Sequence, residues 1–258
     1  MMNKAIIGGT GASSLPNISG MHVVDTEYGA VETYTLTLGN EEILFLPRHG
    51  SGHTTPPHAI NYRANIMALK KMGITHVYAL ATSGSLDAQV PEGSIVIIED
   101  FLDFTSNRIK TYFDGSNQVV AHTDMSDPYC MRLRKAFSDK AQALHIPVSD
   151  HGVYVCTDGP RFEGKSEIRM YQKLGATLVG MTGIPEVFLA KEMNLCYCAI
   201  GLISNMACGI TNENLAKIDH KQAVSKATSD AVRIICEIFA DEVLDQEHCS
   251  CTKSVLYL

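Results

Sequence analysis

Short runs of apolar and β-branched residues recur along the chain, separated by polar or glycine-containing stretches. Runs of this length and composition are typical of buried β-strands. We therefore predict eight strands, at residues 5–8, 33–38, 43–46, 77–81, 95–98, 153–156, 177–180 and 196–204.

Four longer segments between those runs place apolar residues at helical spacing, and prolines stand where three of them begin. The predicted helices are residues 59–72, 128–144, 186–193 and 220–242. Strands that alternate with helices indicate an α/β fold with helices on both faces of a sheet. Since no repeat or low-complexity linker interrupts the pattern, we expect one domain at residues 1–246 and a C-terminal tail at 247–258.

Charge and composition narrow the range of partners. The 258 residues include 21 basic and 28 acidic side chains, a net charge of −7, and no Lys/Arg run exceeds two residues. This balance argues against nucleic acid as a partner. The longest nearly apolar run, residues 195–203, falls short of the roughly 20 residues that span a bilayer. Because the first residues also lack the apolar stretch of a signal peptide, we expect a cytoplasmic protein without membrane contact.

The eight cysteines are interpreted as reduced and mostly buried thiols. Cys249-Ser250-Cys251 stands apart from the others, near the end of the chain. It lacks the C-x-x-C spacing and a second ligand pair nearby in the sequence, which argues against zinc. A local redox-sensitive disulfide stays open as an alternative.

A glycine-rich turn with Thr10 at its centre follows the first predicted strand. Its backbone amides and hydroxyl suit an anion such as phosphate. A dinucleotide-binding fingerprint would need a third glycine where Ser14 stands, and Pro16 interrupts the helix that would follow. An anion site and a simple tight turn both remain open for this segment.

Polar clusters also follow the other predicted strands. Ligands of open α/β sheets bind at such strand ends. Arg48 and His49 offer donors for an oxyanion, Phe162 can stack on a planar base, and Glu163 can accept a hydrogen bond from a ring N–H. We expect one site to collect these groups with the hydroxyl and amide side chains of Thr82, Thr182 and Asn205.

Six longer motifs carry a family resemblance: Gly8-Gly9-Thr10-Gly11, Pro47-Arg48-His49-Gly50, a segment at 57–65, Gly159-Pro160-Arg161-Phe162, Glu167-Ile168-Arg169-Met170 and a segment at 180–186. Over about residues 3–240 the chain resembles the trimeric purine nucleoside phosphorylases, above all their methylthioadenosine phosphorylase branch. The resemblance implies one α/β domain with a mixed central sheet flanked by helices. It also implies a homotrimer, or a hexamer of two trimers, with sites at subunit borders. Inorganic phosphate would be the co-substrate, with no metal or other cofactor.

The resemblance also implies roles for single residues. The phosphate-contacting positions of the family match Thr10, Arg48, His49, Ala81, Thr82 and Thr182. Ala81 departs from the threonine that methylthioadenosine enzymes often carry there, so Thr82 is expected to supply the hydroxyl. Met181 matches a residue under the ribose, Phe162 one beside the base, and His122 a histidine that a neighbouring subunit lends to the 5′ side.

The choice of purine is predicted from the loop after the last strand. The adenine-specific branch carries two aspartates where this chain has Asn205 and Ala207. A 6-oxopurine presents an acceptor at O6 and a donor at N1–H, which suit an amide NH₂ and a carboxylate. We therefore expect Asn205, Glu163 and His49 to carry the chemistry, with inosine, guanosine or methylthioinosine as the nucleoside.

The 5′ side of the nucleoside leaves two alignments open. One places Ile218 against a methylthio group, and the other, slightly favoured, places His220 against a 5′-hydroxyl. Two rival functions also remain: an adenine-type methylthioadenosine phosphorylase, and a nucleotide-binding oxidoreductase or non-catalytic sensor built on the same glycine-rich turn.

Overall fold

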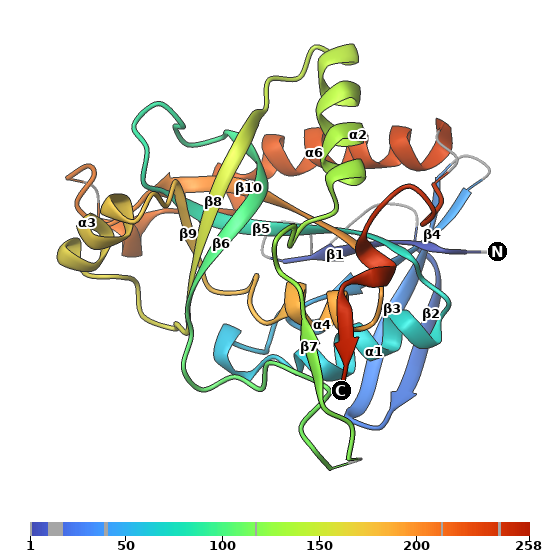
Figure 1. Cartoon of the computed structure of the whole chain (residues 1–258). Coiled ribbons are helices and arrows are strands. Elements are labelled where there is room, and N and C mark those ends of the chain that lie inside the picture. Colours follow the sequence, from blue (N-terminus) through green and yellow to red (C-terminus); the bar gives the residue numbers. More distant parts are fainter. Residues whose placement is uncertain (1, 10–17, 39–40, 117, 213, 242–243) are drawn as a thin grey trace.

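The computed structural model describes residues 2–9, 18–38, 41–116, 118–212, 214–241 and 244–258, and its centre is a mixed nine-stranded sheet (Figure 1). All eight predicted strands are present, several of them longer than expected. In sheet order the nine strands are β10 (Cys196–Met206), β6 (Ile95–Phe104), β8 (Ser149–Thr157), β9 (Leu178–Gly180), β5 (His76–Ser85), β1 (Lys4–Gly8), β4 (Glu41–Pro47), β3 (Gly29–Leu38) and the additional strand β2 (Ile18–Thr26).

Five of these strands close into a ring. β10 pairs with β6 at one edge and also with β5, so the path β5, β10, β6, β8, β9 returns to β5. The strands β1, β4, β5 and β10 run parallel to one another. Their carboxyl ends therefore lie at one edge of the sheet, which brings together segments that are far apart in the chain.

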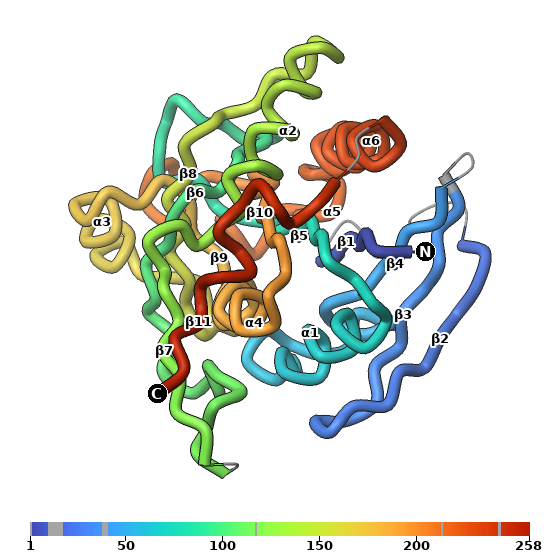
Figure 2. Tube along the Cα trace, turned by 45° about the vertical axis from the view of Figure 1, so that its right-hand side comes forward, coloured from blue at the N-terminus to red at the C-terminus, as the bar shows by residue number. Residues whose placement is uncertain are grey.

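Two layers of helices cover the sheet, as Figure 2 shows most clearly. One core cluster joins the sheet to α1 (Tyr62–Lys71) and α4 (Glu186–Glu192), and the other joins it to α2 (Met131–Ala143) and α6 (Ser225–Asp241). α1 begins where the Asn61 side chain accepts a hydrogen bond from the Ala64 amide. The fold class is therefore the predicted one, an α/β domain with a mixed sheet between helices.

The boundaries of the four predicted helices need correction. A short 3₁₀ turn, Pro57–Ala59, precedes α1, so residues 59–72 are not one continuous helix. The segment predicted at 220–242 divides into α5 (His220–Ala223) and α6, and residue 242 lies outside the described part of the chain. Among the described residues, no helix is both long enough and apolar enough to cross a membrane.

Four elements were not predicted. They are β2, the short strands β7 (Ala121–Thr123) and β11 (Val255–Tyr257), and α3 (Lys165–Lys173), and two further 3₁₀ turns lie at Leu215–Lys217 and Cys251–Lys253. β11 pairs with β7, so the segment at 247–258 lies against the body of the protein. That this tail stands outside the catalytic part remains a prediction.

Candidate active site

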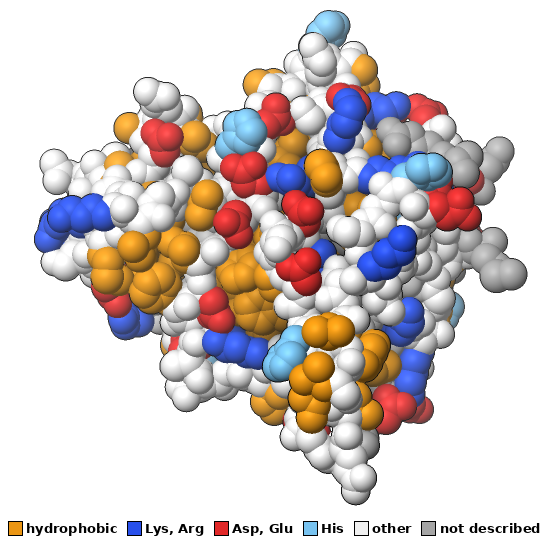
Figure 3. All heavy atoms as spheres, in the orientation of Figure 1, with side chains coloured by type: hydrophobic (Ala, Val, Ile, Leu, Met, Phe, Trp, Pro, Cys, Tyr) orange, Lys and Arg blue, Asp and Glu red, His pale blue; other side chains and the backbone are white. Residues whose placement is uncertain are grey.

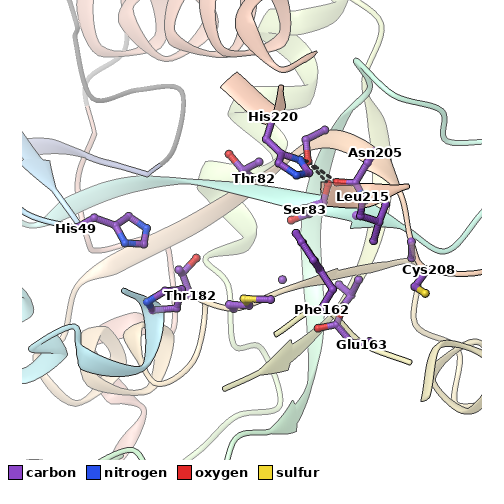
Figure 4. A pocket seen from close by; sticks show the side chains of 17 residues that line it. His49, Thr82, Ser83, Phe162, Glu163, Thr182, Asn205, Cys208, Leu215 and His220 are labelled. Carbon is purple, nitrogen blue, oxygen red and sulfur yellow. Dashed lines mark hydrogen bonds between the residues drawn. The ribbon is translucent and has the colours of Figure 1, made fainter. Parts of the chain in front are cut away.

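A cleft opens where the carboxyl ends of β4, β5 and β10 meet the loops that follow β8 and β9 (Figure 4). Its empty space is about 770 Å³ and includes an opening to solvent, which suits a small molecule such as a nucleoside. The lining residues are His49, Pro57, Thr82, Ser83, Gly84, Phe162, Glu163, Val179, Gly180, Met181, Thr182, Ser204, Asn205, Ala207, Cys208, Leu215 and His220. Nine of the predicted site residues are among them.

His49 and Thr182 lie at one end of the cleft, on the left of Figure 4. His49 Nδ1 lies 2.8 Å from the Thr55 carbonyl oxygen and donates its proton to it. Burial, together with the charge of Arg48, lowers the pKa of His49 to about 4. The ring is therefore neutral at pH 7, and Nε2 keeps a lone pair. In this state Nε2 can accept a hydrogen bond, and the predicted role of His49 as a donor to an oxyanion stays a prediction.

Arg48 is buried beneath this end of the cleft and does not line it. Its Nε and Nη2 donate to the two carboxylate oxygens of Glu186 at 2.7 and 2.8 Å, and Nη1 donates to the Leu80 carbonyl at 2.8 Å. Burial opposes the charge, but the adjacent Glu186 carboxylate holds the pKa of Arg48 above its usual range. The bidentate face predicted to bind an oxyanion is thus bound to a carboxylate of the protein itself.

Two other residues, Thr10 and Ala81, were predicted to contact phosphate. Thr10 lies outside the described residues. Ala81 is buried in the core on β5 and does not line the cleft, whereas its neighbour Thr82 does. The structure therefore supports Thr82 rather than Ala81 as the contact from this strand.

The opposite end of the cleft holds Glu163 and Asn205, each less than a tenth exposed. The Thr157 hydroxyl donates to Glu163 Oε1 at 2.8 Å, and burial raises the pKa of this carboxyl group. Asn205 Nδ2 donates to the Met206 carbonyl at 2.9 Å. Each side chain keeps a further group for a ligand: Oε2 of the carboxylate and the second N–H of the amide.

Phe162 and His220 lie on either side of the space between the two ends. Their ring centroids are 5.8 Å apart, and Phe162 is 45% exposed, so it stands at the mouth of the cleft. Met181 and Ala207 also line the cleft, as predicted. Of the two alternatives for the 5′ side, His220 lines the cleft and Ile218 does not, and Leu215 takes the apolar position instead.

His122 is exposed on β7 and does not line the cleft of its own chain. Its place in a neighbouring subunit's site stays a prediction. Five of the eight cysteines are buried, so most are buried as predicted, and the half-buried Cys208 lines the cleft.

Comparison with known proteins identifies the family. The model of the phosphorylase superfamily matches residues 3–240. The chain belongs to this superfamily. It is 40% identical over 241 residues to the 6-oxopurine nucleoside phosphorylase of Pyrococcus furiosus, with 91% of each chain covered. It is also 40% identical over 250 residues to the "Probable S-methyl-5'-thioinosine phosphorylase" of Methanothermobacter thermautotrophicus, covering 95% of this chain and 86% of the relative.

Solved structures of the superfamily share the fold. A mutant adenosine/methylthioadenosine phosphorylase from Schistosoma mansoni, in complex with methylthioadenosine, aligns with a TM-score of 0.86 at 28% identity. The alignment covers 94% of this chain and 93% of the other. The likeness therefore spans nearly the whole chain.

Arg108 and Tyr154 brace the loops of this phosphorylase and were missed in the sequence. Arg108 Nη2 donates to the carbonyl oxygens of Met181, Asp158 and Thr157 at 2.7, 3.0 and 3.2 Å. The Tyr154 hydroxyl accepts from the amides of Thr182 and Gly183 at 3.2 and 3.3 Å. These contacts join positions far apart in the chain, so no local sequence pattern indicates them.

Proposed function

We propose that this protein catalyses the phosphorolysis of 6-oxopurine nucleosides. The bond between C1′ and the purine nitrogen breaks, a bond between C1′ and a phosphate oxygen forms, and the products are a free purine and a pentose 1-phosphate. The observation that carries the proposal is the pairing of Glu163 with Asn205 at one end of the cleft, with Ala207 beside them. The identity to a named 6-oxopurine nucleoside phosphorylase agrees with it.

A short relay orients the Asn205 amide toward the base. The Ser204 hydroxyl lies 2.6 Å from Asn205 Oδ1 and 3.4 Å from the Ser83 carbonyl, so its single proton goes to the closer acceptor. His220 Nδ1 lies 3.2 Å from the same hydroxyl oxygen. Because Oδ1 accepts from Ser204, the amide NH₂ is turned to donate, which matches N7 and O6 of a 6-oxopurine.

The same relay favours a 5′-hydroxyl on the sugar. When Ser204 donates to Asn205, its oxygen accepts from His220 Nδ1–H, and His220 Nε2 then carries a lone pair. That lone pair can accept a hydrogen bond from a 5′-hydroxyl but gains none from a methylthio sulfur. Inosine and guanosine are therefore the preferred substrates.

Phosphate would bind toward the end that holds His49 and Thr182. Thr82, which lines the same cleft, and Thr10 are also assigned to phosphate from the family pattern. The lone pair on His49 Nε2 suits the P–OH of the monohydrogen phosphate dianion. A phosphate beneath C1′ would stabilise the positive charge that develops on the sugar as the bond to the base breaks. Inorganic phosphate is the co-substrate, and we propose no catalytic cofactor.

We also propose that the enzyme acts as a homotrimer in the cytoplasm, in the salvage of purines. Apolar side chains gather on the surface around β7 and β11, where Val120, Leu256 and Tyr257 are each more than half exposed (Figure 3). His122 lies on β7 between them. A neighbouring copy that covers this surface would place its own cleft against His122. His122 would then complete the neighbour's cleft, since it does not reach the cleft of the chain that carries it.

Nucleoside selectivity tests the proposal. Purine release is measured with inosine, guanosine, adenosine and both methylthio nucleosides, with and without phosphate. We expect the highest kcat/KM with inosine or guanosine and no turnover without phosphate. A preference for adenosine or methylthioadenosine would overturn the proposal.

Two variants test the base and sugar contacts. Asn205→Asp should lower kcat/KM for inosine and raise the relative use of 6-amino nucleosides, because a carboxylate accepts from an exocyclic amine.

Ser204→Ala removes the hydroxyl between Asn205 and His220 without changing a charge. It should lower kcat/KM for inosine more than kcat/KM for methylthioinosine.

S-methyl-5′-thioinosine is the second candidate substrate. Leu215 lines the same cleft and offers an apolar contact for a methylthio group, and one relative carries that activity in its name. Higher kcat/KM for methylthioinosine than for inosine in the wild-type enzyme would favour this candidate.

A further inference from the structure

Four cysteine sulfurs lie together at a place remote from the cleft. The Sγ atoms of Cys130, Cys196, Cys249 and Cys251, here called the cysteine cluster, all lie within 4.8 Å of one another. The Sγ atoms of Cys196 and Cys249 are 3.3 Å apart. None of the four lines the cleft. The second ligand pair that Cys249-Ser250-Cys251 lacks in the sequence is therefore supplied by the fold.

Three separate parts of the fold deliver these sulfurs. Cys130 is the residue at which α2 begins, Cys196 is the first residue of β10, and the other two belong to the tail. Figure 2 shows the tail passing beside β10 before it reaches β11. Three of the four cysteines are buried, and Cys249 is half-buried. Such a convergence of four thiols needs an explanation beyond ordinary core packing.

The spacing suits a single thiophilic ion. Zinc holds thiolate sulfurs at about 2.3 Å in a tetrahedron, so the sulfurs lie about 3.8 Å from one another. The cluster reaches that arrangement with small side-chain adjustments. A cluster of several iron atoms would hold the sulfurs farther apart than these are. We propose that the cysteine cluster binds one zinc ion as a structural Cys₄ site.

Cysteine binds zinc as the thiolate, so a zinc site needs donors that can face the sulfurs. The Gln246 side-chain amide donates to Cys196 Sγ at 3.8 Å. Arg132 and Asp245 line the surface hollow beside the cluster and form an ion pair with each other, at 2.7 Å.

The consequence would be a tail tied to the body of the protein. Zinc would bridge two residues of the tail to the start of α2 and the start of β10. This role does not depend on the proposed reaction, since none of the four cysteines lines the cleft. Zinc should therefore alter stability and leave turnover nearly unchanged.

Metal content is the first test. The full-length protein is produced with zinc in the medium, purified without chelators, and its metal is measured by plasma mass spectrometry. We expect about one zinc per chain, retained in Cys236→Ser, whose cysteine lies on α6 outside the cluster. Cys249→Ser, at the half-buried position, should lose most of the zinc while keeping the wild-type circular dichroism spectrum and a kcat/KM within a few-fold.

Cobalt substitution and thiol counting complete the test. Cobalt(II) added to the zinc-depleted protein should give the intense visible absorption of tetrahedral thiolate coordination, absent in Cys249→Ser. In the zinc-loaded protein, the four thiols should resist alkylation until a chelator is added. A metal-free protein with four free thiols that bind no zinc in equilibrium dialysis would overturn the proposal. So would iron in place of zinc, or a disulfide within the cluster found by mass spectrometry of the unreduced protein.

Discussion

Arg48 presents the Nε and Nη2 edge of its guanidinium to Glu186 and does not line the cleft. Both side chains are almost wholly buried, and Tyr197 adds a third hydrogen bond to the carboxylate, at 2.7 Å. Removing one member of such a buried pair costs about 3–5 kcal/mol, because the other charge stays behind without compensation. Arg48 thus shapes the phosphate end from below, and Glu186 acts with it as a positioning residue.

Substitutions in this pair should separate stability from phosphate use. Glu186→Gln should lower the melting temperature and raise the KM for phosphate, because Arg48 loses its charged partner. Arg48→Met combined with Glu186→Leu removes both charges, so we expect it to recover much of the stability but not the phosphate affinity. Thermal unfolding and phosphate titrations of kcat check both effects. Normal phosphate use by the double variant would mean that Arg48 has no part in the site.

His49 makes stability depend on pH. Its pKa is lowered to about 4 in the folded chain from 6.5, so between these values the unfolded chain binds more protons. Stability from the neutral ring is fully present above pH 6.5 and is lost as the pH falls toward 4. The difference in unfolding free energy between the wild type and His49→Gln should therefore shrink over this window. Urea unfolding at several pH values measures it, with the exposed His58→Gln as the control.

At the scale of elements, the apolar strands and long helices could be predicted, but their partners could not. β5 and β10 are almost continuously buried, and such runs are plain in the sequence. β2 was not predicted because exposed positions and a glycine interrupt its apolar pattern. α3 was not predicted because it buries only Ile168 and Tyr171. The closed ring depends on β10 pairing with two strands at once, and no local pattern encodes that.

In the candidate site, too, single residues could be predicted from the sequence, whereas contacts between distant residues could not. Asn205 near the end of β10 and Glu163 in the loop after β8 could be predicted from the motifs, because both strands are predictable. The pairing of Arg48 with Glu186 joins residues 138 positions apart and reverses the expected role of the guanidinium. The four cysteines likewise meet only once the tail is folded against the body.

The loop after β9 should depend on Tyr154. Tyr154→Phe leaves the amides of Thr182 and Gly183 without their buried acceptor, at a cost of about 1–3 kcal/mol. We expect a lower melting temperature and a higher KM for phosphate, because this loop presents Thr182. Tyr78→Phe is the matched control: its hydroxyl donates to the Leu133 carbonyl in the other core cluster. Tyr78→Phe should lower the melting temperature without changing the KM for phosphate. An equal change of KM in both variants would contradict the role assigned to Tyr154 in the loop after β9.

At the scale of the whole molecule, the tail is attached by packing as well as by the cysteine cluster. Cys251 is 2% exposed, and the Ser254 hydroxyl accepts a hydrogen bond from the buried Lys191 at 3.1 Å. No residue of 247–258 lines the cleft. The tail therefore contributes to stability through the body of the protein rather than through contact with a nucleoside.

Deletion of residues 247–258 tests this separation. The truncated chain should unfold at a lower temperature, because Lys191 loses a buried partner and β7 loses its pairing with β11. At 25 °C, kcat/KM for inosine should stay within a few-fold of wild type if the truncated chain still assembles, which light scattering reports, because Leu256 and Tyr257 lie on the surface proposed for the neighbouring copy. Differential scanning calorimetry and steady-state kinetics measure the two effects. A truncation that is folded but inactive would show that the tail takes part in the site.

The closed ring of strands also sets the order of events during synthesis. On the ribosome, β5 (His76–Ser85) emerges long before β10 (Cys196–Met206), which covers one of its edges. At about 5–20 residues per second, that edge waits on the order of 10 s for its partner. An apolar strand with an unpaired edge is prone to join another chain. The nascent polypeptide is therefore most exposed to aggregation in this interval, and slower translation should make it depend more strongly on chaperones.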